Sequence, residues 1–135
     1  MTRAMTPPVE SATPPVEPAT LRMHAVVIDC AGLEGPIAFW SAALGYVEWF
    51  ARQGQFAGIT PPVPDRRLPI IFQLVPEPKV GKNRVHLDYE TPDRPAEVAR
   101  LIGLGAREIG EHSLGDARWT VMADPDGNEF CVVGA

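Results

Sequence analysis

Several side chains that could bind a metal ion or move a proton lie in short apolar segments of this chain. Two of these segments, "RMHAVVIDC" (22–30) and "RVHLDYE" (84–90), each contain a histidine. The complete set of such side chains is His24, Gln73, His86, Asp88, Glu129 and Cys131. Neutral imidazole suits Zn, Fe, Ni or Cu, and a thiolate favours softer ions such as Zn. The residue types are therefore compatible with a divalent-metal site, although each histidine alone could instead be a hydrogen-bonded structural residue.

Strand alternation predicts that these side chains share one side of the fold. Successive side chains of a strand point to opposite faces, so Gln73 in "IIFQLV" (70–75) lies opposite Ile70 and Phe72. The predicted apolar faces are Ala25 and Val27; Ile70, Phe72 and Leu74; Val85, Leu87 and Tyr89; and Phe130 and Val132. We expect these faces to pack against helices and the opposite faces, which carry the polar groups, to converge on a concave side.

Two helices and eight strands are predicted to carry these faces. The helices are expected at 34–45 and 93–105, with Asp93 as the N-cap of the second and Gly45 just past the end of the first. The strands are expected at 22–30, 46–50, 55–60, 70–75, 84–90, 106–112, 118–124 and 128–133.

The order of these elements is a strand, a helix and three strands, repeated once. His24 matches His86 at an offset of 62 residues, and Leu44-Gly45 matches Leu104-Gly105 at an offset of 60. This internal duplication predicts an α+β fold in which two paired βαβββ modules form a curved mixed sheet around a central cleft.

Composition limits the partners of the chain. A net charge of −5 and a pI near 5.1 argue against binding to nucleic acid or to an anionic membrane. The chain contains no apolar run long enough to span a membrane and no signal peptide, so we expect a cytoplasmic protein with reduced thiols at Cys30 and Cys131. Residues 1–21 repeat TPPVE and are predicted to be a disordered Pro-rich tail, which leaves residues 22–135 as the folded domain.

Several motifs of the chain resemble those of a known superfamily. They are "MHAVVIDC" followed by "AFWSAALGY", "NRVHLDYETPD" followed by "EVARLIGLGA", and "WTVMADPDGNEF". Together they resemble the vicinal oxygen chelate superfamily, which includes glyoxalase I, bleomycin-resistance proteins, fosfomycin-resistance transferases and ring-cleaving dioxygenases. More narrowly, the chain looks like the glyoxalase-like domain subgroup that is common in actinobacteria.

This resemblance implies a set of metal ligands from the first, fourth, fifth and eighth strands. By position these are His24, Gln73 and His86, with Cys131 where the family usually has a glutamate. Three interpretations of Cys131 remain open. It could be a soft ligand, Glu129 could replace the missing acid from two residues earlier, or the site could have lost its metal and Cys131 could be a buried packing residue.

The resemblance also implies two classes of function. The first is a lyase or isomerase that acts on a small oxygenated substrate, with Zn, Ni, Fe or Mn as Lewis acid and Glu129 or Asp88 as the carboxylate that moves a proton. Asp88 could instead orient His86 or form a salt bridge with an arginine.

The second class is a metal-free protein of the bleomycin-resistance type that sequesters an aromatic or drug-like compound, and absence of a cofactor is an equal alternative to a bound metal. The aromatic side chains Trp49, Phe56 and Trp119 would line the ligand cavity unless they pack in the core. Members of this type suggest a homodimer.

Overall fold

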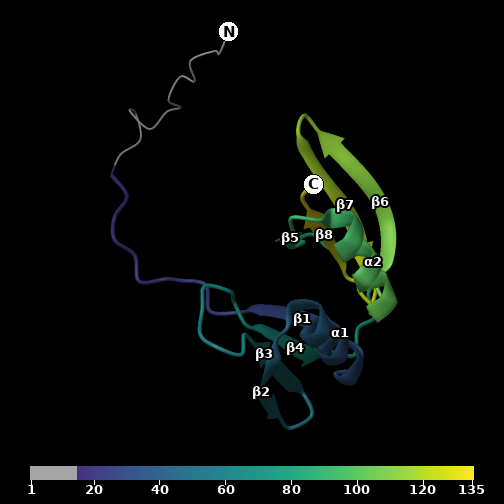
Figure 1. The fold of residues 1–135 in the computed structure, drawn as a ribbon. Helices are drawn as coiled ribbons and strands as arrows, with labels where there is room; N and C mark the ends of the chain where they lie inside the picture. The colour runs from purple at the N-terminus through teal and green to yellow at the C-terminus, as the bar shows by residue number, and fades with distance from the viewer. Residues whose placement is uncertain (1–14) are drawn as a thin grey trace.

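Two four-stranded sheets, each accompanied by one helix, form the protein (Figure 1). The computed structural model describes residues 15–135. The first half consists of β1 (Val26–Cys30), α1 (Glu34–Leu44), β2 (Val47–Arg52), β3 (Phe56–Thr60) and β4 (Ile70–Leu74). The second half consists of β5 (Asp88–Glu90), α2 (Arg94–Leu104), β6 (Arg107–Leu114), β7 (Ala117–Ala123) and β8 (Glu129–Val133). The predicted pair of βαβββ modules is therefore confirmed.

The two sheets have the same topology. The strand order is β1-β4-β3-β2 in the first sheet, sheet A, and β5-β8-β7-β6 in the second, sheet B, so each strand matches the one four places later. In each sheet one end pair is parallel, β1 with β4 and β5 with β8, and the other pairs are antiparallel. A register shift interrupts β2 between Glu48 and Phe50 and β6 between Glu108 and Gly110. Even the irregularities of the fold are thus duplicated.

The predicted helix ends are confirmed. The Asp93 carboxylate accepts a hydrogen bond from the backbone N–H of Ala96 at 3.2 Å, which satisfies one of the donors left open in the first turn of α2. Gly45 ends α1 at a φ of 68° and Gly105 ends α2 at a φ of 118°, both in the left-handed region that favours glycine.

The first strand of each module is shorter than predicted. β1 begins at Val26 and β5 at Asp88, so His24 and His86 both precede their strands. The ladder explains the limit in sheet A, because Val26 pairs with Ile70, the first residue of β4, and the residues before Val26 have no strand partner in the described part of the chain.

The expected orientation of β1 is wrong. Ile28 packs against the core and Cys30 is buried within it, whereas Val27 is 52% exposed on the other face. The reason is that both faces of this segment are largely apolar, so hydrophobicity could not distinguish them. Most of the other predicted faces are confirmed: Ile70, Phe72, Phe130 and Val132 are buried, and Tyr89 packs against the same core. Val85 is the exception, because it precedes β5 and is 79% exposed instead of packing on the same face as Tyr89.

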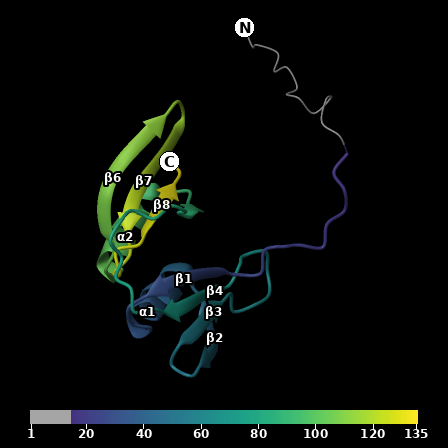
Figure 2. The ribbon, with the colours of Figure 1, turned by 180° about the vertical axis from the view of Figure 1, so that it is seen from behind.

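One core spans both modules, with Trp40 of α1 at the point where they meet. Its ring lies 4.8 Å from that of Phe130 and 5.3 Å from that of Tyr89, both from the second half. The indole N–H of Trp40 also donates a buried hydrogen bond of 3.0 Å to Oδ2 of Asp124. The two helices lie beside each other at this junction, as Figure 2 shows from behind, and Arg100 of α2 donates to the carbonyls of Ala42 and Ala43 in the last turn of α1.

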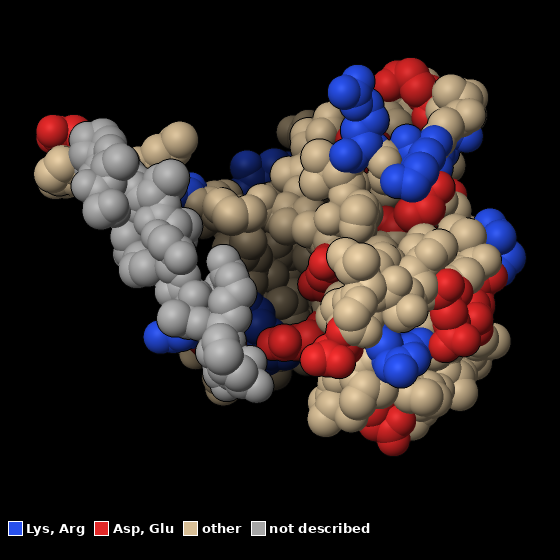
Figure 3. All heavy atoms as spheres, turned by 90° about the horizontal axis from the view of Figure 1, so that it is seen from above, with Lys and Arg blue, Asp and Glu red and all other residues tan. Residues whose placement is uncertain are grey.

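One face of the molecule carries charged side chains of both signs. In Figure 3, Lys and Arg side chains lie among Asp and Glu side chains on the face seen from above, with uncharged surface between them. Among the described residues, no helix is long and apolar enough to cross a membrane. Part of the predicted tail, residues 1–14, lies outside the described residues, and residues 15–21 contain no helix or strand.

Replacing Trp40 with phenylalanine should destabilise the protein more strongly at neutral pH than in acid. Burial raises the pKa of Asp124, and hydrogen bonds from Trp40, Asn128 and Asp126 partly oppose that rise by favouring the charged form. Loss of the indole donor raises the pKa of Asp124 further, because the charged form loses a hydrogen bond. The resulting loss in the free energy of unfolding is therefore fully present above this raised pKa, where Asp124 is charged, and it shrinks as the pH falls below it. We expect a loss of about 2 kcal/mol in the free energy of unfolding at pH 7, measured by denaturant titration. Trp119→Phe, on a half-buried strand position, is the control, and equal losses in both variants would contradict the assignment.

Candidate metal and ligand site

Three potential metal ligands of different chemistry meet on sheet B. Ligand atoms of His86, Asp88 and Cys131 all lie within 4.8 Å of one another. The parallel register of β5 and β8 explains this, because Asp88 pairs directly with Cys131 and paired residues point to the same face of a sheet. His86 precedes Asp88 by two residues on the same side, and its Nε2 lies 3.5 Å from Oδ1 of Asp88. The structure thus joins three of the six residues selected from the sequence.

Cys131 is the buried member of this cluster. Its side chain is only 4% exposed, and His86 and Asp88 are both exposed. Burial raises the pKa of the Cys131 thiol, and the neighbouring Asp88 carboxylate raises it further, while Lys82 acts in the opposite direction. The thiol is therefore stabilised in its neutral form unless a cation is bound beside it, since a coordinating thiol is deprotonated.

Glu129 does not join the cluster, because its oxygens have other partners. Oε2 forms a salt bridge of 3.1 Å with Lys79, and Oε1 accepts a hydrogen bond of 2.9 Å from the backbone N–H of Asn83. Although burial acts in the opposite direction, the hydrogen bonds from Asn83 and Lys79 lower the pKa of the Glu129 carboxyl overall. The carboxylate thereby ties the loop before β5 to the start of β8.

The remaining two predicted ligands lie on sheet A. His24 and Gln73 line a cavity of about 520 Å³ on the open face of this sheet, together with Trp49 and Phe56. The floor is built from two rows of paired residues: Arg52, Phe56 and Gln73 in one, and Phe50, Gly58, Ile71 and Val27 in the other. The four predicted ligands His24, Gln73, His86 and Cys131 are therefore divided between two sheets.

Trp119 occupies neither group. It pairs with His112 and Val133 in sheet B and stacks on the His112 ring at 5.7 Å. Trp119 lines none of the five cavities identified in the described residues. Its role in ligand binding therefore stays a prediction.

Phe50 and Arg52 are lining residues that the sequence did not single out. Neighbouring residues of a regular strand point to opposite faces, yet Trp49 and Phe50 both reach the cavity, because the irregularity in β2 falls at Trp49. A Cβ on Gly58 would lie 2.7 Å from Cε1 of Phe50 and 2.9 Å from Cε3 of Trp49, so the two rings cover the space that this glycine leaves. The sequence contains the pair Trp49-Phe50 and, in the next strand, Gly58. Only the register shows that this glycine lies opposite the two rings.

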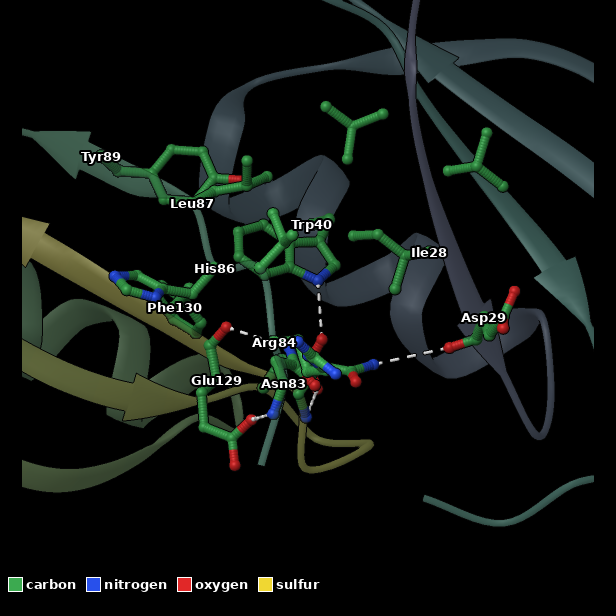
Figure 4. A pocket seen from close by; sticks show the side chains of 15 residues that line it. Ile28, Asp29, Trp40, Asn83, Arg84, His86, Leu87, Tyr89, Glu129 and Phe130 are labelled. Atoms are coloured by element: carbon green, nitrogen blue, oxygen red, sulfur yellow. Dashed lines mark hydrogen bonds between the residues drawn. The ribbon is translucent and has the colours of Figure 1, made fainter. Parts of the chain in front are cut away.

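A second cavity, of about 340 Å³, lies between the modules (Figure 4). In Figure 4 the Trp40 indole lies between Tyr89, His86 and Phe130 on one side and Ile28 and Asp29 on the other. The hydroxyl of Tyr89 is buried without a hydrogen-bond partner in the described residues, and burial raises the pKa of this group. His86 lines this cavity and also belongs to the cluster with Asp88 and Cys131, whereas those two residues do not line it.

Comparison with known proteins places these features in context. The sequence profile of the family described as glyoxalase-like domain matches residues 25–133. No curated protein matches the chain in sequence.

Several solved structures share the fold. A glyoxalase/bleomycin resistance protein/dioxygenase family enzyme from Burkholderia phytofirmans is 20% identical, with a TM-score of 0.66 over 82% of this chain and 95% of that chain. A fosfomycin resistance protein from Listeria monocytogenes, complexed with Mn(II) and a dihydroxypropylphosphonic acid, is 14% identical, with a TM-score of 0.70 over 84% and 90%. A lactoylglutathione lyase from Agrobacterium tumefaciens is 15% identical, with a TM-score of 0.63 over 88% and 96%.

Adding a methyl group at Gly58 should disturb the aromatic floor of the sheet A cavity. The rings of Trp49 and Phe50 must move to admit the new Cβ, and we expect Gly58→Ala to cost about 1–3 kcal/mol and to change the fluorescence of the protein. Gly103→Ala is the matched control, because nothing lies within 4 Å of its Cβ and α2 should gain about 0.5–1 kcal/mol from alanine. Denaturant unfolding of both variants tests this, and a neutral effect of Gly58→Ala would show that the rings do not depend on the glycine.

Proposed function

The chain belongs to the glyoxalase-like domain family, and from that premise we propose that it is a metal-dependent lyase or isomerase acting on a small oxygenated substrate. The proposed metal ligands are His86, Asp88 and Cys131. The observation that carries the proposal is the convergence of an imidazole, a carboxylate and a thiol within 4.8 Å on one sheet.

The donor set fits a divalent ion such as Zn²⁺. Zinc sites use nitrogen, oxygen and sulfur ligands, and donors around a tetrahedral ion lie about 3.5 Å apart. His86 and Asp88 are exposed, so small rotations of these two side chains can bring them to this separation around the buried Cys131. A bound ion would act as a Lewis acid on an oxygen of the substrate.

Asp88 is the carboxylate that we assign to proton movement. With Oδ1 towards His86 and the proposed ion, the second oxygen of this 64% exposed carboxylate can accept a proton from a substrate in the cavity of about 430 Å³ that Asp88 helps to line. Glu129 is the weaker choice, because Lys79 and Asn83 already engage its oxygens and the pKa of its carboxyl is lowered. Of the three interpretations of Cys131, the proposal adopts the soft ligand.

Ligand sequestration without a metal is the second candidate function. The observation that favours it is the aromatic lining of the sheet A cavity, which suits a flat organic compound. This function needs neither His86 nor Cys131, and metal analysis separates the two candidates.

We also propose a homodimer, as the family resemblance implied. The outer strands β2 and β6 carry large apolar side chains that are exposed in the single chain, with Val47 at 46%, Ile109 at 48% and Leu114 at 77%. A second copy that covered the β2 edge or the β6 edge would bury the apolar side chains of that edge.

Metal analysis of protein purified without a metal-binding tag tests the first proposal. We expect close to one equivalent of a divalent metal, measured by mass spectrometry, and loss of most of it in His86→Ala and in Cys131→Ser. His112→Ala and Cys30→Ser are matched controls, since His112 is exposed on the same sheet and Cys30 is a buried thiol of sheet A. Metal content that falls equally in His112→Ala and His86→Ala would argue against the assigned ligands.

The mass of the protein in solution tests the homodimer. Light scattering should give twice the chain mass of 14.7 kDa, and the double variant Ile109→Lys/Leu114→Lys should shift the population towards the monomer because it places two charges on the β6 edge. Val80→Lys, at an exposed loop position, should leave the mass unchanged. A wild-type mass of one chain would remove this proposal and leave the metal site unaffected.

A further inference from the structure

We propose that the open face of sheet A binds a planar aromatic anion, such as an aromatic carboxylate. This aromatic face is defined by His24, Trp49, Phe50, Arg52, Phe56 and Gln73, which line the cavity of about 520 Å³. The inference rests on the second candidate function, which uses the same cavity, and deepens it by naming the charge of the ligand; it does not require a metal.

Aromatic side chains determine the shape of the ligand. The Trp49 ring packs edge-on against Phe50 at 5.0 Å and against His24 at 5.9 Å, and Phe56 lies in the neighbouring strand. Trp49 is 41% exposed, which leaves much of this large apolar surface open to the cavity. Aromatic rings prefer offset or edge-to-face contact with other rings, so a flat ring system is the ligand that best covers this surface.

Arg52 determines the charge of the ligand. It pairs with Phe56 across the strands, so its side chain leaves the same face of the sheet, and its guanidinium lies 5.7 Å from the centre of the Phe50 ring. Within residues 15–135 it forms no salt bridge. Its five N–H donors match a carboxylate, and its contact with Phe50 holds it beside the aromatic surface.

No carboxylate among the cavity-lining residues competes with the ligand for Arg52. The nearest acidic residue of the same row is Asp29, which pairs with Gln73 on β1 and lies three strand spacings from Arg52, about 14 Å away. Glu48, on the same strand as Arg52, pairs with Ile59, which is fully buried on the opposite face. The cavity is therefore locally positive in a chain with a net charge of −5.

Polar groups opposite Arg52 can orient the ligand. Gln73 and His24 line the same cavity and offer an amide and an imidazole to a hydroxyl or carbonyl group. A ligand with an aromatic ring between Trp49 and Phe56 and a carboxylate at Arg52 would use every chemical group on this face. Arg52 would repel a cationic aromatic compound, so we expect this face to bind anionic ligands more tightly than cationic ones.

Three naphthalene ligands of similar size and different charge test this inference: 2-naphthoate, neutral 2-naphthamide and 2-naphthylmethylammonium. Their affinities are measured by calorimetry on the full chain, with and without a chelator, at low salt. We expect naphthoate to bind about tenfold more tightly than naphthamide, naphthylmethylammonium to bind most weakly, and the difference to shrink in high salt.

Variants of Arg52 assign the effect to this residue. Arg52→Gln should equalise naphthoate and naphthamide, and Arg52→Lys should retain part of the preference. Arg66→Gln is the matched control, at an exposed arginine that does not line the cavity, and should preserve it. Trp49→Ala should weaken all three ligands alike.

Several results would overturn the inference. They are equal affinity for the three ligands, no saturable binding of any of them, unchanged preference in Arg52→Gln, or ligand-induced chemical shifts confined to sheet B or to the Trp40 cavity. Because binding is also measured in the chelated protein, failure here leaves the metal proposal standing, and failure of the metal proposal leaves this inference testable.

Discussion

Trp40 makes the buried contacts that hold the two modules against each other. It belongs to the first module, yet its ring contacts Phe130 and Tyr89 and its N–H donates to Asp124, all in the second. Asp124 in turn accepts from the backbone of Asp126 and Asn128 and so shapes the turn before β8. A buried carboxylate is costly unless its hydrogen bonds are satisfied, so the indole and the turn must be in place together. The strand that carries Cys131 is therefore positioned by a side chain from the other half of the chain.

The cluster of His86, Asp88 and Cys131 depends on this placement and on one parallel ladder. β5 is only three residues long, and its pairing with β8 decides that Asp88 lies beside Cys131 rather than one residue away from it. A shift by one residue would turn Cys131 to the core and Phe130 to the opposite face of sheet B. Because of the internal repeat, β1 pairs with β4 in sheet A as β5 pairs with β8 in sheet B. The corresponding face of sheet A carries Val27, Ile71 and Gln73. The two copies of the module thus present different side chains, a cluster of His86, Asp88 and Cys131 in one and an aromatic cavity in the other.

The aromatic face illustrates how an irregularity in a sheet can create a surface. The register shift at Trp49 has a counterpart at Ile109 in the second module, but only in the first does the next strand carry a glycine opposite two rings. Val121 stands opposite Gly110 in sheet B, so the order of small and large residues is reversed there. The same backbone geometry therefore presents a broad aromatic surface on sheet A, where Arg52 adds a charge.

The sequence by itself determined the fold class, the duplication, both helices with their caps, and most of the strand faces, because these depend on local propensity and on periodic burial. It also selected His86, Asp88 and Cys131, since polar and soft residues on otherwise apolar strands are conspicuous. Only the tertiary structure decided which of the selected residues meet. The separation of His24 and Gln73 from the sheet B cluster, the engagement of Glu129 by Lys79, and the appearance of Phe50 and Arg52 beside Trp49 all follow from register, from a bulge and from a loop. Those features are set by contacts between residues far apart in the chain, and no local pattern encodes them. The faces of β1 show the same limit, because a segment that is apolar on both sides acquires its orientation only from the neighbours that it packs against.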